Sequence, residues 1–381
     1  MNVALNLLQL SPGRTEGIVT YVRQLAALVP EPMGENRLII LQQPGLDLGS
    51  IDTNKIKVIC LERPRIILRI IGRGLTLLGL NSPFTFKNRI HSIIDRNKID
   101  IVHYPFSSIP AEDMELNSKI VLSIMDLQHE YLPELFSTKE LKSRRAVFLK
   151  SAQKADIIIS ISDYTKKTIV EKFNIPEAKI TTIPLAGDTS PTPKNVAGLP
   201  NDYMFFPAAD WHHKNHMKLL EALGQLKNNG FNGKLVLTGH RSEKAEAIHT
   251  KIAKLGLTDD VIDLGSVSFD ELAYVFSKAK MLIYPSRFEG FGIPPLEAMS
   301  IGLPVACSGT TSLPEIVGDA AEMFNPESVD EIVASILKVW DDKTYRAKLK
   351  AAGYKQAAKF SWKRTAEDTY KVYRETYEKN K

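Results

Sequence analysis

The sequence predicts an α/β protein built from two doubly wound domains, each with a parallel sheet. Three observations lead to this fold class. The chain has 381 residues, which is more than a single hydrophobic core usually organises. Short, continuous apolar runs alternate with amphipathic, helix-like segments, and strands of this kind are buried on both faces of a sheet. Two such series are separated by residues 187–202, which are rich in proline, glycine and small polar residues.

The first series fills the N-terminal half of the chain. Its apolar runs are expected to form the strands of one sheet, and the amphipathic segments between them to cover that sheet. The expected strands lie within residues 3–10, 36–43, 99–104, 119–126, 155–162 and 179–186, and two of the expected helices within residues 20–29 and 163–173.

The second series begins after residue 202 and repeats the pattern. Its expected strands lie within residues 203–209, 234–239, 261–265, 281–286, 303–308 and 320–324. A charged, periodic helix from about Trp362 closes the chain. We therefore expect an N-terminal domain over residues 1–187, a C-terminal domain over residues 188–360, and a final helix, residues 361–381, that packs back toward the first domain.

The composition is that of an ordinary globular protein, with 44% apolar and 24% charged residues. Cys60 and Cys307 lie far apart in the sequence, which favours a reducing compartment without a disulfide framework. The opening residues lack the basic region of a signal peptide, and no run of about 18 uncharged apolar residues could span a membrane. A cytoplasmic protein is expected.

The positive charge is concentrated in one segment. The chain has a net charge of +5, and residues 62–89 alone contain six basic residues against one glutamate. Within this segment, residues 65–80 mix isoleucine and leucine with arginines at intervals of four, the pattern of a helix that lies on an anionic bilayer surface. The alternative is a core helix with a basic outer face, and three glycines weaken either helix. We expect residues 62–92 to bind the inner face of the plasma membrane; without a nucleic-acid motif, nucleic acid is not an expected partner.

Functional residues should follow the strands, because ligands bind beyond the carboxyl ends of the strands in open parallel sheets. Neither half carries a G-x-G-x-x-G after its first strand, and no G-x-x-x-x-G-K-[ST] occurs, which argues against NAD binding and P-loop phosphoryl transfer. Glycines and polar residues do follow the expected strands: Gly13 and Gly17, Asp126 and His129, Lys214 and Asn215, Gly239 and His240, and Glu289.

Residues 286–302, SRFEGFGIPPLEAMSIG, carry the strongest local signal. They follow an apolar run, and they place Pro295 where a helix begins and Gly302 where it ends, so a strand, a glycine loop and a short helix are expected. Gly290 and Gly292 would let backbone N–H groups approach a ligand, beside a helix N-terminus that favours an anion such as phosphate.

Two carboxylates, Glu289 and Glu297, flank this anion site. Because carboxylates repel a diphosphate, they are better suited to accept hydrogen bonds from hydroxyl groups on either side of it. A nucleotide sugar has this layout, with hexose and ribose hydroxyls at the two ends of a diphosphate. The alternative is that Glu297 complements the helix dipole and that Glu289 is a solvated loop residue.

Taken together, these segments resemble the retaining glycosyltransferases of the GT-B fold, specifically family 4. Glu289 to Glu297 fits the E-x7-E motif of that family, and residues 207–216, PAADWHHKNH, resemble its phosphate-binding Lys-Asn segment. Residues 160–188, 311–328 and 360–362 resemble further parts of it. The resemblance implies two Rossmann-like domains that face each other across a cleft, with the acceptor bound by the N-terminal domain and a nucleotide-sugar donor by the C-terminal domain.

The resemblance also implies roles for individual residues. Lys214 would pair with the donor diphosphate and stabilise the charge that develops as the nucleoside diphosphate leaves. Glu289 would accept hydrogen bonds from the hexose, Glu297 would hold the ribose hydroxyls, and Asp126 would complete the catalytic group. The remaining donor contacts would come from Gly17, His129, Asn215, Gly239, Ser266, Val267, Gly290, Phe291 and Gly292.

No metal or other cofactor is expected, because lysine and helix dipoles can carry the phosphate charge and no Asp-x-Asp occurs in the chain. The chain departs from the family where many relatives place an arginine before the lysine, since it has Ala208, Ala209 and Asp210 there. His212, His213 or a residue of the other domain could substitute.

Two further features, His129 and the Ser312–Glu315 segment, each have a structural reading beside the functional one. His129 is either a ligand contact or a local structural residue. Glu315 and Ser312 fit an S-x-x-E capping box, and the resemblance adds that their loop lies near the donor; both readings can hold together.

The expected function is transfer of a hexose, with mannose from GDP-mannose as the first choice and a UDP-hexose as another donor, to a glycan acceptor. The basic segment suggests that this acceptor is lipid-linked, as in bacterial O-antigen or polysaccharide assembly. Two alternatives remain: a nucleotide-sugar epimerase of the same fold, and a non-catalytic subunit that docks on the membrane.

Overall fold

The computed structural model of the protein describes residues 1–10, 17–49, 52, 54–62, 86–187, 192–243 and 245–379. The chain divides into two compact units, and the second is inserted into the first. Unit 1 comprises Met1–Pro184 together with Trp362–Lys381, and unit 2 comprises Leu185–Ser361.

Within the described residues, unit 1 holds a seven-stranded sheet in the order β3-β2-β1-β4-β5-β6-β7, with every neighbouring pair parallel. The strands are β1 (Asn2–Asn6), β2 (Arg37–Gln42), β3 (Ile56–Cys60), β4 (Ile101–Tyr104), β5 (Lys119–Ile124), β6 (Ile157–Ser160) and β7 (Ile180–Thr182). The helices of this unit are α1 (Gly17–Leu28), α2 (Pro30–Met33), α4 (Phe86–Arg96), α5 (Gln128–Tyr131), α6 (Thr138–Lys154), α7 (Asp163–Phe173) and α15 (Trp362–Glu378), with single 3-10 turns at Ala111–Asp113, Pro133–Leu135 and Glu177–Lys179.

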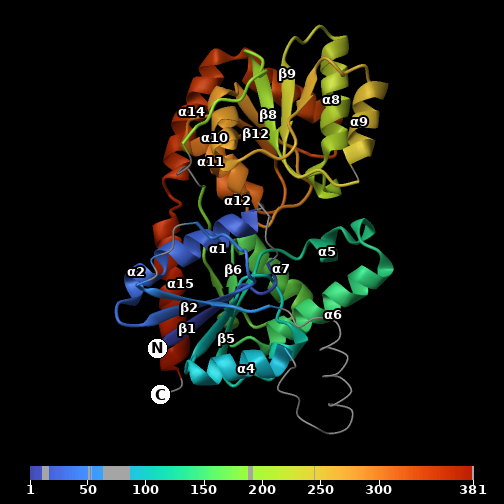
Figure 1. Ribbon diagram of the computed structural model, residues 1–381. Coiled ribbons are helices and arrows are strands. Elements are labelled where there is room, and N and C mark those ends of the chain that lie inside the picture. Colours follow the sequence, from blue (N-terminus) through green and yellow to red (C-terminus); the bar gives the residue numbers. More distant parts are fainter. Residues whose placement is uncertain are drawn as a thin grey trace. The chain divides into compact units, whose positions relative to one another are not determined.

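Unit 2 holds a six-stranded sheet in the order β10-β9-β8-β11-β12-β13, again parallel throughout the described residues. Its strands are β8 (Tyr203–Pro207), β9 (Lys234–Thr238), β10 (Val261–Asp263), β11 (Met281–Tyr284), β12 (Val305–Ser308) and β13 (Glu322–Phe324). Its helices are α8 (His216–Asn228), α9 (Ala245–Lys254), α10 (Phe269–Lys278), α11 (Ile293–Ser300), α12 (Leu313–Val317), α13 (Val329–Asp341) and α14 (Lys343–Ala357), with 3-10 turns at His212–Lys214 and Gly318–Ala320. The prediction of two doubly wound parallel sheets is confirmed (Figure 1).

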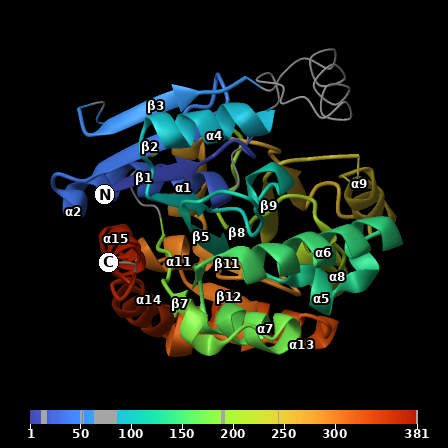
Figure 2. The same ribbon diagram turned by 90° about the horizontal axis from the view of Figure 1, so that it is seen from below.

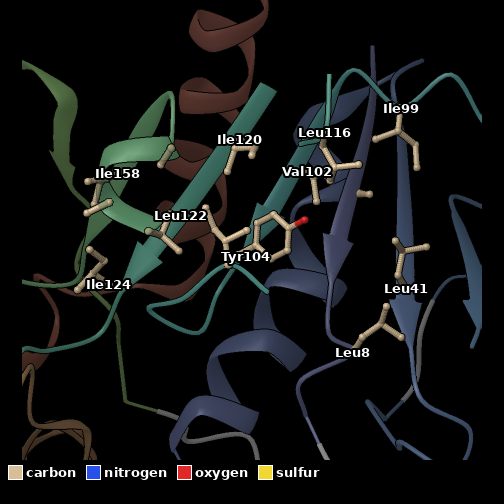
Figure 3. Packing of buried hydrophobic residues seen from close by; sticks show 14 of the residues in the cluster. Leu8, Leu41, Ile99, Val102, Tyr104, Leu116, Ile120, Leu122, Ile124 and Ile158 are labelled. Carbon is tan, nitrogen blue, oxygen red and sulfur yellow. The ribbon is translucent and has the colours of Figure 1, made fainter. Parts of the chain in front are cut away.

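The apolar runs became strands because their side chains are buried on both faces of the sheets. One face of the first sheet packs against α4, α6 and α7 through a buried hydrophobic cluster. Figure 3 shows side chains of this cluster, among them Val102, Tyr104, Ile120, Leu122 and Ile158. β3 was not among the expected strands. It lies at the sheet edge with Lys57 and Val58 exposed, so it lacks the continuous apolar run that marks the inner strands.

The other face of the first sheet carries a buried polar chain. His103 on β4 shares hydrogen bonds of 2.7 Å with the hydroxyl groups of Tyr373 on α15 and Ser123 on β5. The Ser123 hydroxyl in turn lies 2.9 Å from that of Tyr21 on α1. These bonds join the C-terminal helix to the first sheet, where α15 packs along α1 and α2 (Figures 1 and 2).

Candidate functional site

The centre of the site is an ion pair between the ends of two adjacent strands of unit 2. Lys214 follows β8 and Glu289 follows β11, and these strands are neighbours at the point where the strand order reverses. Crevices at such reversals are the usual ligand sites of doubly wound sheets. The Lys214 ammonium donates to Glu289 Oε1 at 2.7 Å and to the Tyr284 hydroxyl at 3.0 Å. Both charged side chains are 12% exposed.

The pair is ionised although it is largely buried. Burial alone would lower the pKa of Lys214, but the negative charge of Glu289 and the Tyr284 hydroxyl raise it above its ordinary value. Burial alone would raise the pKa of Glu289, but the charge of Lys214 lowers it below its usual range. Glu289 is therefore not a solvated loop residue, and the two groups neutralise each other while no other ion is bound between them.

Hydrogen bonds to backbone carbonyl groups hold together the two loops that carry Lys214 and Glu289. Asn215 adopts the left-handed conformation at φ +66°, and its side-chain amide donates to the carbonyl oxygens of Pro285 at 3.1 Å and Pro326 at 2.8 Å. The Arg287 amide also donates to the carbonyl of His213 at 2.7 Å. Asn215 was predicted to contact the donor substrate. Because both of its side-chain amide hydrogens are used in these bonds, its side chain positions the loops around Lys214 and Glu289.

The Gly290-Phe291-Gly292 loop is fixed by the segment after β12. The Thr311 hydroxyl accepts the Glu289 amide at 3.1 Å, and the Ser312 hydroxyl donates to the carbonyls of Glu289 and Phe291 at 2.9 and 2.8 Å. Gly292 has φ +121°, and a Cβ atom there would lie 2.6 Å from the Leu313 side chain. The capping box predicted for Ser312 and Glu315 is wrong, since Ser312 makes no side-chain cap on α12.

Helix α11 starts at Ile293, and Pro295 lies in its first turn, as the sequence predicted, beside Pro294. Proline has no N–H group, so this helix start offers an anion its dipole but few hydrogen-bond donors. Glu297 lies in the second turn, and no acidic residue lies in the first. The alternative that Glu297 only complements the helix dipole is therefore not favoured, because that effect fades beyond the first turn.

Gly187 was not among the site residues predicted from the sequence. Its Cα approaches the second turn of α11 so closely that an added Cβ would lie 3.0 Å from the Glu297 amide nitrogen. The only sequence signal was a glycine in a polar linker, which does not identify its neighbour.

The ends of β8, β9 and β10 form the second part of the site. Gly239 after β9 has φ +129°, and its amide donates to the Gly265 carbonyl at 2.8 Å, just before Ser266 and Val267. A Cβ atom on Gly239 would lie 2.5 Å from the carbonyl of Ala208. The predicted donor contact Gly239 is therefore joined by a backbone hydrogen bond to the residue that precedes the predicted donor contacts Ser266 and Val267.

Arg241, also missed from the sequence, braces these strand ends. Its guanidinium forms a two-pronged ion pair with Asp263, at 2.7 and 2.9 Å for the shortest contacts, and donates to the carbonyls of Ala208 and Gly239 at 3.0 and 3.1 Å. Burial would raise the pKa of Asp263, but hydrogen bonds from Arg241 and His249 hold it below its usual range. A guanidinium thus contacts the backbone carbonyl of Ala208, one of the three residues at which the family resemblance implied an arginine.

His213 does not supply the positive charge of that arginine. Its side chain is buried beside Lys214, and burial followed by the lysine charge lowers its pKa to about 3. The imidazole is therefore neutral at physiological pH.

The predicted site residues of unit 1 differ from one another in burial and in hydrogen bonding. Asp126 follows β5, and its carboxylate accepts the Gln128 amide at 2.9 Å. Gly17 is the exposed first residue of α1. His129 is 1% exposed and lies between the edges of Phe136 and Phe148, and burial lowers its pKa to about 4. The structure thus favours the structural alternative for His129.

Several expectations concern metals and membranes. Among the described residues, no group of three or more His, Cys, Asp or Glu side chains is arranged to hold a metal ion. None of the helices in the described part of the chain combines the length and apolar composition that crossing a bilayer requires. Most of the basic segment, residues 63–85, lies outside the described residues.

Comparisons with known proteins agree on one family. The model of "Glycosyltransferase Family 4" matches residues 15–190, and that of "Glycosyl transferases group 1" matches residues 193–356. O-antigen chain mannosyltransferase B of Escherichia coli is 31% identical over 267 residues, which cover 67% of this chain and 70% of that protein. The serotype-specific mannosyltransferase WbdA of Escherichia coli is 28% identical over 254 residues, and the match spans 66% of this chain but only 31% of WbdA.

The fold comparison covers nearly the whole chain. The structure of Anabaena Alr3699/HepE in complex with UDP and glucose has a TM-score of 0.75 at 16% identity, and the match covers 97% of this chain and 98% of that one.

Proposed function

Since the chain belongs to glycosyltransferase family 4 and has the GT-B fold, we propose that it transfers a hexose from a nucleotide sugar to a glycan acceptor with retention of configuration. The observation that carries this proposal is the buried Lys214–Glu289 pair at the strand-order reversal of unit 2. The first choice of donor is GDP-mannose, because O-antigen chain mannosyltransferase B and WbdA are both named as mannosyltransferases.

The pair gives the donor site a way to exchange charges. A bound diphosphate brings negative charge toward Lys214, which then shares its ammonium protons with a phosphate oxygen as well as with Glu289. Weakening that contact frees Glu289 to accept hydrogen bonds from hexose hydroxyls. As the bond between the sugar and the phosphate breaks, negative charge grows on the leaving phosphate, and a preorganised lysine in a largely buried site stabilises it.

Backbone N–H groups would assist the lysine. Helix α8 begins at His216, two residues after Lys214, and has no side-chain cap on its first turn, so its free N–H groups and dipole can meet a phosphate. The start of α11 contributes mainly its dipole, because the prolines in its first turn have no N–H groups to donate. With Lys214 and these donors, the reaction needs no metal, and transfer should continue in the presence of EDTA.

The acceptor in this proposal is a lipid-linked glycan of a bacterial surface polysaccharide, used at the cytoplasmic face of the membrane. Its support is the O-antigen chain assignment of the Escherichia coli relative and the basic residues of segment 62–92. Flotation with anionic and neutral vesicles tests the membrane part, and binding that ignores both salt and the replacement of Arg65, Arg69 and Arg73 by glutamate would contradict it.

The donor is tested by thermal denaturation with GDP-, UDP-, ADP- and TDP-sugars, because a ligand that binds only the folded state raises the melting temperature. We expect GDP-mannose to give the largest shift and Glu297→Ala to remove it. A larger shift with another nucleotide would reassign the base.

Catalysis is tested with Lys214→Met, which retains most of the side-chain volume. We expect transfer of labelled mannose to fall by roughly 100-fold or more, because the leaving phosphate loses its charged partner. Lys218→Met, on the first turns of α8 and 37% exposed, is the control. Full transfer by a folded Lys214→Met protein would overturn the enzymatic proposal.

A further inference from the structure

Unit 1 has its own strand-order reversal, between β1 and β4. The chain runs from β1 outward to β2 and β3, then returns to place β4 on the other side of β1. The crossovers on the two sides of this point leave the sheet in opposite directions, which opens a crevice beyond the carboxyl ends of the two strands. Of the predicted donor contacts, Gly17 follows β1 in the chain, but it does not line the cavity described next.

A cavity of about 430 Å³ lies there. This size is within the range of small-molecule sites in proteins. Its walls come from four places in unit 1: the end of β1 and the residues after it, the residues 108–114 after β4, Ile90 of α4, and the middle of α6. Leu8, Ile109, Met114 and Val147 make much of the lining apolar.

Asp113 is the unusual member of this wall. It is fully buried, and its Oδ2 atom accepts hydrogen bonds from the Tyr104 hydroxyl at 2.9 Å and from the Asn6 amide at 3.2 Å. Its Oδ1 atom has no hydrogen-bond partner among the described residues. A buried carboxylate oxygen without a partner costs free energy, and such an atom calls for a bound donor.

The outer part of the cavity adds further polar groups. Gln9 and Ser108 join the two strand ends, since the Gln9 amide donates to the Ser108 carbonyl at 3.0 Å and the Ser108 hydroxyl donates to the Gln9 side-chain oxygen at 3.2 Å. The exposed Lys150 of α6 also lines the cavity. Apolar walls with a few fixed polar groups match the two kinds of surface on a sugar ring, its C–H face and its hydroxyl edge.

We propose that this cavity binds one sugar residue of the glycan acceptor, with Asp113 accepting a hydrogen bond from a sugar hydroxyl. The inference rests on the proposed function, because it assigns the cavity to the acceptor of that reaction. Its ligand class is an uncharged hexopyranose, and the apolar walls exclude water from the hydroxyl that meets Asp113.

Binding is tested by saturation-transfer NMR on the full chain with the methyl glycosides of mannose, glucose, galactose and N-acetylglucosamine. Val147 is 40% exposed, so Val147→Trp should fold normally while its indole fills the cavity. We expect at least one glycoside to bind, and Val147→Trp to weaken that binding tenfold or more. Val58→Trp is the matched control, because Val58 is 36% exposed on β3 and does not line the cavity.

Asp113→Asn tests the carboxylate without changing its shape. Loss of a charged acceptor should weaken binding about tenfold. No binding by any of the four glycosides, or equal binding by the wild type and Val147→Trp, would overturn the inference.

These results are separable from failure of the proposed function, which is measured on unit 2 through Lys214 and GDP-mannose. If the enzyme is active and Val147→Trp leaves its KM for the acceptor unchanged, the assignment of the cavity is wrong and the proposed function stands. If the glycosides bind but no sugar is transferred, the proposed reaction is wrong and the cavity is still a sugar-binding site.

Discussion

Gly239 shows how a single missing Cβ atom can determine the shape of the donor site. Its φ of +129° is rarely adopted by other residues, and a Cβ atom would lie 2.5 Å from the Ala208 carbonyl. We predict that Gly239→Ala lowers the free energy of unfolding by about 3 kcal/mol, because it adds a backbone collision to conformational strain. Urea unfolding measures this change.

Gly230→Ala is the matched control, since Gly230 has φ +82° and nothing within 4 Å of an added Cβ. It should cost about 1 kcal/mol from the left-handed conformation alone. Equal losses for the two variants would show that contact with Ala208 does not matter.

Glu289 tests whether the ion pair serves catalysis or only stability. Glu289→Gln retains hydrogen-bonding atoms beside Lys214 but removes the negative charge, so the protein should fold. We predict a fall in kcat of about 100-fold with a smaller change in KM for the donor, because a charged acceptor bonds sugar hydroxyls more strongly as charge develops on the ring.

The control for this variant is Glu327→Gln, which removes one carboxylate of an exposed pair with Arg287. It should leave kcat unchanged. A Glu289→Gln enzyme with normal kcat would limit Glu289 to orienting Lys214.

At the scale of elements, the brace formed by Arg241 joins the ends of three neighbouring strands. Arg241 and Asp263 are 14% and 13% exposed, so removing the arginine leaves a mostly buried carboxylate with fewer partners. We predict that Arg241→Met lowers the free energy of unfolding by about 3 kcal/mol. It should also raise KM for the donor, because the Gly265-Ser266-Val267 segment loses its support.

Arg364→Met is the comparison, because Arg364 pairs with Asp368 on the exposed side of α15; surface pairs of this kind contribute less than about 1 kcal/mol. The double variant Arg241→Met/Asp263→Asn should be less destabilised than the two single losses added together. Strict additivity would mean that the two side chains do not act as a pair.

The elements themselves were predictable where local pattern decides them. Inner strands such as β5 and β11 carry continuous apolar runs, and α11 carries proline at its start and Gly302 after its end. The edge strand β3 lacks such a run. Partners distant in sequence were also not predictable: Asn215 donates to Pro326, and Ser312 holds the Gly290-Phe291-Gly292 loop instead of capping α12.

At the scale of the whole molecule, both units bury histidines in the neutral state. Burial lowers the pKa of His103, His213 and His216 to about 3 and that of His129 to about 4, against an ordinary value of 6.5. The unfolded chain takes up these protons below pH 6.5, but the folded chain does not until the pH approaches the lowered values. The stability they provide is therefore complete above pH 6.5 and is lost as the pH falls.

One buried acid works in the opposite direction. Burial raises the pKa of Asp113 to about 6 from 3.8, so between those values the folded state holds a proton that the unfolded state has released. This group makes the protein more stable as the pH falls from 6 to 4 and offsets part of the loss from the histidines.

Because four histidines oppose one aspartate, we predict that the free energy of unfolding falls between pH 7 and pH 5. Each histidine contributes a loss of about 1–2 kcal/mol over this range. His103→Gln should reduce the loss in unfolding free energy between pH 7 and pH 5 by the contribution of one histidine. The variant should also be less stable at pH 7, because Tyr373 and Ser123 lose their hydrogen-bond partner. Urea unfolding at pH 7, 6 and 5 measures both effects, with the exposed His240→Gln as the control for losing a histidine. If the imidazole signal of His103 instead titrates near pH 6.5 in the folded protein, its neutral burial under α15 is not the source of the acid sensitivity.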